Sequence, residues 1–423
     1  MLLRKRQKDF VEAAAAYRGD SPSALLWKRF RRNGMAMTSL VIISLFTLVA
    51  LLGYLITPDH TPHCNQQYLE LASLKPLSKA SFLCIPFETE NGERRAENGE
   101  RRTENGKRRT ESGERRAENG ERRAENGERR AESGERRTES GERKTENGLA
   151  IINGKPLDYV AIPVEKYSIS GDSIRAVPYN GDPIVASSGD AYIQRRTFLL
   201  GTDTYGRDLL SQVMIGSRVS LSIGFIAVAI ALLIGILLGS LAAFYGGWVD
   251  NIVMWFINVV WSIPTVLLVI AITFALGKGF WQVFVAVGLT MWVDVARVVR
   301  GQVLSVKENE YVEAARALGY STPRIILRHI MPNITGPVIV IAASNFASAI
   351  LLEAGLSFLG IGVQPPMPSW GTMVKENYGQ ILLDNAHLAF IPGIAIMVIV
   401  LAFMLLANGI RDALDIKESG ENS

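Results

Sequence analysis

Histidine and cysteine supply the one stretch of this 423-residue chain that has the composition of a metal site. His60, His63 and Cys64 lie within five residues of one another, and zinc is bound by such nitrogen and sulfur atoms. Further ligands are not evident, so a loop without a metal is the favoured interpretation. Cys64 and Cys84 are the only cysteines. They have the chemistry to form a disulfide in an oxidising compartment, and the sequence leaves that pairing open.

Common catalytic spacings are absent from the sequence. Three Gly-Lys pairs begin at Gly106, Gly154 and Gly277, and none has the glycine five residues earlier that a phosphate-binding P-loop requires. The patterns H-E-x-x-H and G-x-S-x-G do not occur either. The sequence therefore predicts that this chain does not bind ATP by a P-loop.

The polar segment with the most regular spacing lies between residues 297 and 333. Residues 307–318 are good helix formers, and Gly319 is placed to end that helix in a left-handed conformation. Thr322 is expected to cap a second helix that begins with proline, and Pro332 is expected to end it. The segment is thus predicted to be a helix, a turn and another helix.

The first of these helices has a face suited to contact with a partner. Tyr311, Ala314, Ala315 and Leu318 recur at helical spacing, and the small alanines allow close approach. An amphipathic helix lying on lipid headgroups is the alternative interpretation of the same pattern.

Glu313, Ala314 and Ala315, followed by Gly319 and a segment that ends at Pro332, resemble the EAA loop of binding-protein-dependent ABC importer permeases. The family pattern is E-A-A-x3-G-x9-I-x-L-P. This chain has histidine at the Ile position and methionine at the Leu position. That histidine is similar to the His-Ile-Leu-Pro ending of the dipeptide, oligopeptide and nickel branch.

Further segments resemble the same branch. Residues 200–208 are similar to its entry to the second span, and residues 352–371 to the stretch that follows its fifth span. The resemblance covers residues 199–416 and, more loosely, 25–57. Residues 59–198 are a departure, because this segment is longer than its counterpart in the family and holds a repeat.

The resemblance implies an all-α polytopic membrane protein with a MetI-like permease core, similar to the second, C-type permease subunit of peptide importers. It implies a homologous second permease, two ATP-binding subunits and an external solute-binding protein as partners. ATP and magnesium would be bound by the ATPase subunits, so this chain would need no cofactor and catalyse no covalent chemistry. The helix after residue 307 would dock on the ATPase, with Glu313 either facing it or paired with Arg316.

Composition and hydropathy agree with a membrane protein. Hydrophobic residues make up 48% of the chain and mean hydropathy is +0.16, although 20% of the residues are charged. The net charge of +4 argues against a nucleic-acid-binding protein. Apolar stretches long enough to cross a bilayer as helices predict six spans. They lie at residues 35–56, within 219–249, within 251–277, and at 279–296, 334–352 and 388–408.

Ionisable side chains are nearly absent from these stretches. Asp294 lies at the end of the fourth, where it is expected to pair with Arg297. Gly235 and Gly239 form a G-x-x-x-G pattern that permits close helix packing, and Pro264 is expected to kink the third span.

The distribution of basic residues predicts the orientation. Residues 1–34 carry nine basic side chains, and the 297–333 segment also holds a cluster, whereas the segment between the last two spans holds only Lys375. Both termini are therefore expected in the cytoplasm of a multi-pass inner-membrane protein. The predicted organisation begins with a cytoplasmic segment (1–34), a first span (35–57) and an external loop (58–205). A five-helix core with its coupling loop (206–416) and a cytoplasmic tail (417–423) follow.

A seven-residue unit, E-N-G-E-R-R-A and its variants, recurs through residues 90–148 of the external loop. It offers at most one alanine and always a glycine, so it lacks the two apolar positions of a coiled-coil heptad and is expected to be disordered. A spacer is favoured over a phosphate- or heparin-binding element. Residues 149–200 are expected to form a small β-rich cap.

The sequence predicts a permease subunit that moves dipeptides or oligopeptides inward. A nickel or other small-solute permease of the same branch is the alternative within transport. A membrane anchor that displays the repeat is the alternative outside it.

Overall fold

The computed structural model describes residues 22–86, 159–277 and 279–415. The chain divides into two compact units. The loop unit runs from Leu52 to Gln212, and the membrane unit combines the residues up to Leu51 with those from Val213 onward. The heptapeptide repeat at 90–148 lies outside the described residues, so its predicted disorder stays a prediction.

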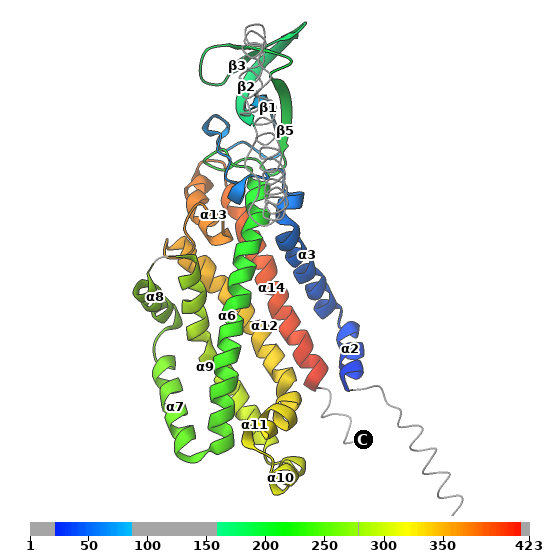
Figure 1. Cartoon of the computed structure of the whole chain (residues 1–423), viewed down its shortest axis with the longest axis vertical. Helices are drawn as coiled ribbons and strands as arrows, with labels where there is room; N and C mark the ends of the chain where they lie inside the picture. Colours follow the sequence, from blue (N-terminus) through cyan, green and yellow to red (C-terminus); the bar gives the residue numbers. More distant parts are fainter. Residues whose placement is uncertain (1–21, 87–158, 278, 416–423) are drawn as a thin grey trace, which may run out of the picture. The chain divides into compact units, whose positions relative to one another are not determined.

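Five helices in the described chain are long and apolar enough to cross a membrane, and a bent helix pair brings the number to six. Five of the six predicted spans are confirmed as single helices, and most of these are longer than the sequence indicated because polar turns extend them; the third is the bent pair. They are α3 (Gly34–Ile56), α6 (Leu209–Tyr245), the bent pair α7 (Gly247–Trp261) and α8 (Thr265–Leu276), α9 (Phe280–Val306), α12 (Met331–Phe358) and α14 (His387–Asp415). Within the membrane unit, α12 packs against α9 and α14 (Figure 1).

The third apolar stretch is two helices and not a single kinked span. α7 and α8 meet at an angle of 91° across a break at residues 262–264. Pro264 lies at the start of α8 with extended backbone angles, φ −55° and ψ 125°. Proline lacks the N–H that would continue α7 and its ring clashes with the preceding turn, so the chain changes direction here. The predicted kink at Pro264 is confirmed, and it is larger than a kink within one helix.

The helix α9 is the most enclosed of these helices. In the most apolar 18-residue stretch of α9, 67% of the residues are buried, compared with 22% in α3. It packs against α6 at Gly235 and Gly239, where an added Cβ would lie 2.5 Å from the Val295 Cβ and the Ala296 carbonyl oxygen respectively. The close packing predicted from the G-x-x-x-G pattern is therefore confirmed.

Short elements cover the ends of the membrane unit. They are α2 (Pro22–Arg32), α13 (Trp370–Asn377) and η4 (Tyr378–Leu382). Ser369 begins α13 with a capping box that it shares with Thr372. The buried Trp370 donates its indole N–H to the Val213 carbonyl at 2.9 Å and packs edge-on against Phe46, which fixes α13 on α6 and α3.

The loop unit holds a five-stranded antiparallel sheet, so the all-α class applies to the membrane unit alone. The strand order is β4-β3-β2-β1-β5. The strands are β1 (Ser78–Pro86), β2 (Tyr159–Ser170), β3 (Ser173–Pro178), β4 (Ile184–Ser187) and β5 (Tyr192–Phe198), with the short helices η1 (Pro62–Cys64) and η2 (Leu69–Leu71) before them. The expected β-rich cap is present, but one central strand, β1, precedes the repeat.

Side chains on both faces of β1 are buried. Phe82 and Cys84 are buried in a cluster with Tyr68 and Phe198, whereas Leu83 is buried on the opposite face in a second cluster. β1 bonds to β2 along one edge and to β5 along the other, so it lies inside the sheet.

The side chains of the histidine- and cysteine-rich stretch make other bonds. The Cys64 thiol donates to the Asp59 carbonyl at 3.0 Å, His60 Nδ1 lies 2.8 Å from the Tyr54 carbonyl, and no disulfide joins Cys64 to Cys84. In the part of the chain that the structure describes, no three His, Cys, Asp or Glu side chains cluster as metal ligands. Both thiols are buried, and burial raises the pKa of the Cys84 thiol.

The α6–α9 contact generates a stability prediction. Gly239→Ala puts a methyl group against the Ala296 carbonyl, so the two helices must separate. We expect the detergent-solubilised protein to lose about 1–3 kcal/mol of unfolding free energy. Gly393→Ala in α14 is the matched control, because nothing lies within 4 Å of an added Cβ there. Thermal unfolding of the two variants tests the contact, and equal melting temperatures would contradict it.

Candidate coupling site and membrane cavity

The segment around Gly319 forms the predicted helix and turn. α10 (Glu310–Ala317) is followed by Gly319 at φ +74°, in the left-handed region. The Gly319 N–H donates to the Arg316 carbonyl at 2.9 Å, and the Tyr320 N–H donates to the Ala315 carbonyl at 3.2 Å. These two bonds form a Schellman motif, which ends the helix and satisfies its last carbonyls. The predicted left-handed glycine is confirmed.

The second helix differs from the prediction at both ends. α11 (Thr322–Ile325) has Ser321 at the cap position, so the expectation of a Thr322 cap is wrong. Pro332 does not end the helix, because α11 continues through a π turn, η3 (Ile326–Ile330), into α12. In an α-helix the proline ring would clash with the carbonyl four residues earlier, and the widened i→i+5 turn just before Pro332 relieves that clash. The second half of the predicted coupling loop, from Thr322 onward, is therefore the first part of the fifth span.

The inner face of α10 is packed onto the membrane helices. Val312 and Ala315 are buried, and they belong to the same apolar core as Ile330 and the lower part of α9. The Arg316 guanidinium lies 4.7 Å from the centre of the Phe244 ring at the end of α6. Ala315 was expected on the partner-facing side, and that expectation is wrong because it supplies the inner contact.

Ring contacts fix the turn between α10 and the π turn. Tyr320 stacks on His329 with ring centres 5.8 Å apart, and the Arg324 guanidinium lies 4.3 Å from the Tyr320 ring centre. Asn333 donates from its side-chain amide to the Tyr311 hydroxyl at 3.0 Å. Together these contacts hold the two helices in one orientation.

The outer face of α10 is exposed. Tyr311, Ala314 and Leu318 lie on it at helical spacing, and Leu318 is 71% exposed. Glu313 is also exposed and has no ion pair with Arg316 in the described chain, and its predicted contact with an ATPase stays a prediction. α10 and α11 lie at one end of the membrane unit, and α13 lies at the other (Figure 1).

Ionic contacts tie α9 to α6 and α7 near the same end. The Arg300 guanidinium donates two hydrogen bonds of 2.6 Å to the Asp250 carboxylate, a bidentate pair. Lys307 donates from Nζ to the Ala243 carbonyl at 2.8 Å. Arg297, Arg300 and Lys307 had been assigned to the loop, but Arg297 and Arg300 lie within α9 and Lys307 is its C-cap.

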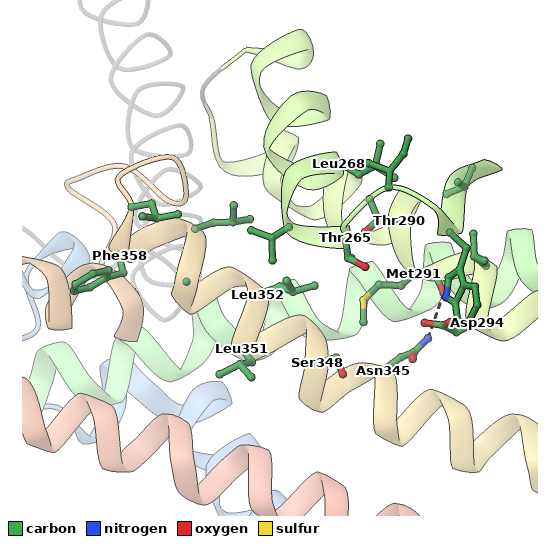
Figure 2. Close-up of a pocket in the computed structure, with 18 residues that line it drawn as sticks. Thr265, Leu268, Thr290, Met291, Asp294, Asn345, Ser348, Leu351, Leu352 and Phe358 are labelled. Carbon is green, nitrogen blue, oxygen red and sulfur yellow. Dashed lines mark hydrogen bonds between the residues drawn. The ribbon is translucent and has the colours of Figure 1, made fainter. Parts of the chain in front are cut away.

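A cavity of about 630 Å³ lies where α7 and α8 break. Its wall comes from the break itself and from α9 and α12, and most of its lining is apolar. Figure 2 shows polar side chains from three of these elements around it. They are Thr265, Thr290, Asp294, Asn345 and Ser348.

Asp294 lines this cavity and does not form the expected pair with Arg297. The Arg297 guanidinium donates to the Asn258 side-chain oxygen at 3.0 Å and lies 3.7 Å from the Trp261 ring centre. The interfacial pair is absent because Asn258 and Trp261 of α7 hold the guanidinium instead. Asp294 is exposed and makes no hydrogen bond or ion pair with any residue that the structure describes.

Glu353 is a buried carboxyl that the sequence reasoning missed. It is fully buried in α12, where the Ser357 hydroxyl donates to it at 2.7 Å and the Ser220 hydroxyl at 3.2 Å. The predicted fifth span ended at Leu352, which placed Glu353 outside the membrane. The E-x-x-x-S spacing, which brings Glu353 and Ser357 onto one helical face, was the available signal.

Comparison with known proteins identifies the family. Residues 231–418 match the model of the binding-protein-dependent transport system inner membrane component, and residues 21–76 match the N-terminal transmembrane domain of oligopeptide transport permease C. The glutathione transport system permease protein GsiD of Pectobacterium atrosepticum is 41% identical over 218 residues, 52% of this chain and 72% of the relative. The chain belongs to this family.

Other members show similar identity. The dipeptide transport system permease protein DppC of Alkalihalophilus pseudofirmus and the oligopeptide transport system permease protein OppC of Bacillus subtilis are each 40% identical over 217 residues. Each match covers 51% of this chain and 71% of the relative. A chain of the MetNI methionine ABC transporter covers 49% of this chain and 97% of its own length, at 18% identity and a TM-score of 0.41.

Membership makes the chain a multi-pass inner-membrane permease subunit of an ABC importer. The family works with an ATPase, a solute-binding protein and a second permease. The 231–418 match includes both α10 and the cavity, so both features lie in the permease domain itself.

Proposed function

We propose that this chain is a permease subunit that moves dipeptides or oligopeptides inward, driven by ATP hydrolysis in two separate ATP-binding subunits. A homologous second permease and an external solute-binding protein complete the transporter. The chain itself binds no ATP or magnesium and is not catalytic. The named activities of its relatives, which transport dipeptides, oligopeptides and glutathione, support a peptide substrate.

We propose further that Glu313, Ala314, Ala315, Gly319 and Pro332 belong to the element that couples the ATPase to the membrane helices. One observation carries this proposal: α10 is buried on one side in the membrane core and exposed on the other. A push on the exposed face is therefore expected to reach α9 and α12 as a rigid-body movement, because Val312 and Ala315 belong to an apolar core that includes residues of both helices and Tyr311 is hydrogen-bonded to Asn333 of α12.

The charge of the outer face favours a protein partner over lipid headgroups. Three charged side chains of α10 are exposed, and two of them are acidic, Glu310 and Glu313. The third, Arg316, holds its guanidinium 4.7 Å from the Phe244 ring centre, so the exposed charge of the helix is net negative. Helices that lie on anionic membranes carry lysine and arginine on their polar face. An acidic face with exposed Leu318 suits a basic or apolar groove on another protein.

The proposed topology has α10 in the cytoplasm. The N-terminal segment 1–34 and the tail 417–423 lie on the same side, and the loop 58–205 lies outside. The basic residues near α2 and α9 support this orientation. The position of α10 at the opposite end from α13 agrees with it (Figure 1).

Two other functions make different demands on the chain. A membrane anchor needs a single apolar helix, whereas this chain encloses α9 among several others and tightly packs α10. A nickel permease of the same branch is distinguished by its solute. Uptake of a labelled dipeptide by the reconstituted transporter, with labelled nickel as the parallel solute, distinguishes a peptide permease from a nickel permease.

The coupling proposal predicts the effect of two outer-face substitutions. Glu313→Lys reverses the charge of the exposed face, and Leu318→Asp removes its most exposed apolar side chain. Both should leave the folded permease at its normal level in the membrane, because neither side chain is buried. Both should reduce copurification of the ATPase subunits and peptide uptake at least tenfold, a loss of about 1.4 kcal/mol of binding free energy.

Leu382→Asp in η4 is the matched control, because Leu382 is 90% exposed and lies away from α10. It should leave ATPase copurification unchanged. Full ATPase binding by the Glu313→Lys, Leu318→Asp double variant would refute the assignment of α10 as the docking helix.

Deletion of the repeat is predicted to leave transport intact. Pro86 at the end of β1 is paired with Tyr159 at the start of β2, so the chain leaves and rejoins the sheet at neighbouring positions. Deleting 90–148 leaves residues 87–89 and 149–158 to close this hairpin, and a shorter loop lowers the entropy cost of closure. Membrane level and peptide uptake of the deletion variant should match the parent protein. Normal level with lost uptake would show that the repeat has a working role.

A further inference from the structure

The cavity at the break between α7 and α8 has the size and lining of a small-molecule site. Its volume of about 630 Å³ lies within the range of roughly 300–1,000 Å³ that is typical of ligand pockets. Apolar side chains make up most of the wall, and the polar ones come from α8, α9 and α12. Non-helical backbone at membrane depth is tolerated where it lines such a cavity, and residues 262–264 supply it here.

Asp294 gives this cavity its negative charge. In Figure 2 its carboxylate lies beside Asn345 and Met291, with Ser348 one turn along α12 from Asn345. Asn345 uses its amide N–H on the Met291 carbonyl at 3.4 Å, so its side-chain oxygen still has lone pairs to accept a hydrogen bond. Arg297 follows one turn later on α9, but Asn258 and Trp261 hold its guanidinium.

A carboxylate in a membrane-spanning helix is expensive to maintain and marks a functional site by default. Here the carboxylate faces a cavity and is not hydrogen-bonded to a described neighbour. The complementary ligand carries a positive charge that donates hydrogen bonds, attached to an apolar or mixed body. A single carboxylate without histidine or cysteine is a poor match to a nickel ion, which prefers imidazole ligands.

We propose that this cavity contacts the transported solute and that Asp294 binds the protonated amino terminus of a short peptide. The inference rests on the proposed peptide-import function. The ammonium group donates to the Asp294 carboxylate, the Asn345 side-chain oxygen and the Ser348 hydroxyl accept further hydrogen bonds, and the apolar wall receives a side chain of the peptide. Asp294 is therefore a specificity-determining residue of the permease, separate from recognition by the solute-binding protein.

The test compares one dipeptide with a free amino terminus and the same dipeptide N-acetylated. The complete transporter is reconstituted in proteoliposomes with the parent chain, Asp294→Asn or Asp294→Glu. The solute-binding protein is identical in all three, so its own preference cancels when the uptake ratios of the two peptides are compared. We expect Asp294→Asn to lower the ratio of free to acetylated peptide about tenfold, the loss of one charge-assisted hydrogen bond, and Asp294→Glu to retain most of it.

A second measurement does not depend on transport. Ser348→Cys places a thiol on the cavity wall, and the free dipeptide should slow its reaction with a maleimide whereas the acetylated dipeptide should not. Asp294→Asn should abolish this protection.

Three results would overturn the proposal. An unchanged uptake ratio in Asp294→Asn would show that the carboxylate does not bind the amino terminus. Loss of the second permease from the purified Asp294→Asn complex would show that the carboxylate pairs with that subunit. Equal protection of Ser348→Cys by both peptides would show that the cavity does not recognise the charged amino terminus. Failure of the parent transporter to move any peptide, with nickel taken up normally, is a separate outcome that refutes the proposed substrate class.

Discussion

Val312 and Ala315 form the contact on which the proposed mechanism depends. They join a short, otherwise exposed helix to the core that also contains the lower parts of α9 and α12. Close-packed interiors transmit displacement because they have few voids in which it is absorbed. The Schellman turn at Gly319 and the Tyr320–His329 stack keep α10 from rotating about this contact. We infer that a partner bound to the outer face acts on the core that α9 and α12 share.

The break at Pro264 borders a cavity, in contrast to the closely packed contact of α10. The bend of 91° turns α8 away from the line of α7 and leaves the cavity against α9 and α12. The same two helices thus line the cavity and supply part of the apolar core that Val312 and Ala315 join. Movement of α10 is expected to change the cavity wall, which links the proposed ATPase contact to the proposed solute contact through α9 and α12.

The membrane helices and the coupling turn could be predicted because their signals are local. Charge-free apolar stretches locate the spans, and Gly319 after a run of helix formers locates the left-handed turn. The resemblance of the EAA pattern to the permease family was confirmed by the matches of the chain to that family. The close packing at Gly235 and Gly239 was also anticipated, since small residues four apart share one helical face.

Other features depend on contacts that one sequence does not reveal. The sequence predicts a helix end at Pro332, because a π turn that accommodates proline has no clear sequence signature. Asp294 was paired with Arg297 by proximity, but Arg297 bonds to Asn258 in a helix that lies far away in sequence. Likewise β1 could not be assigned to the sheet, since its partners lie beyond the repeat. The errors at Asp294 and β1 concern long-range partners, whereas the error at Pro332 concerns a local backbone turn.

The most direct test that α10 docks on an ATP-binding subunit is a crosslink from its outer face. A photoreactive maleimide is attached at Ala314→Cys, and at Leu382→Cys as the exposed control, in the assembled transporter; Cys64 and Cys84 are buried and should react little. Docking of α10 on the ATPase predicts an adduct between the permease and an ATP-binding subunit from Ala314→Cys and none from Leu382→Cys. An Ala314→Cys probe that crosslinks only to lipid would contradict it, because α10 would then be a helix on the membrane surface.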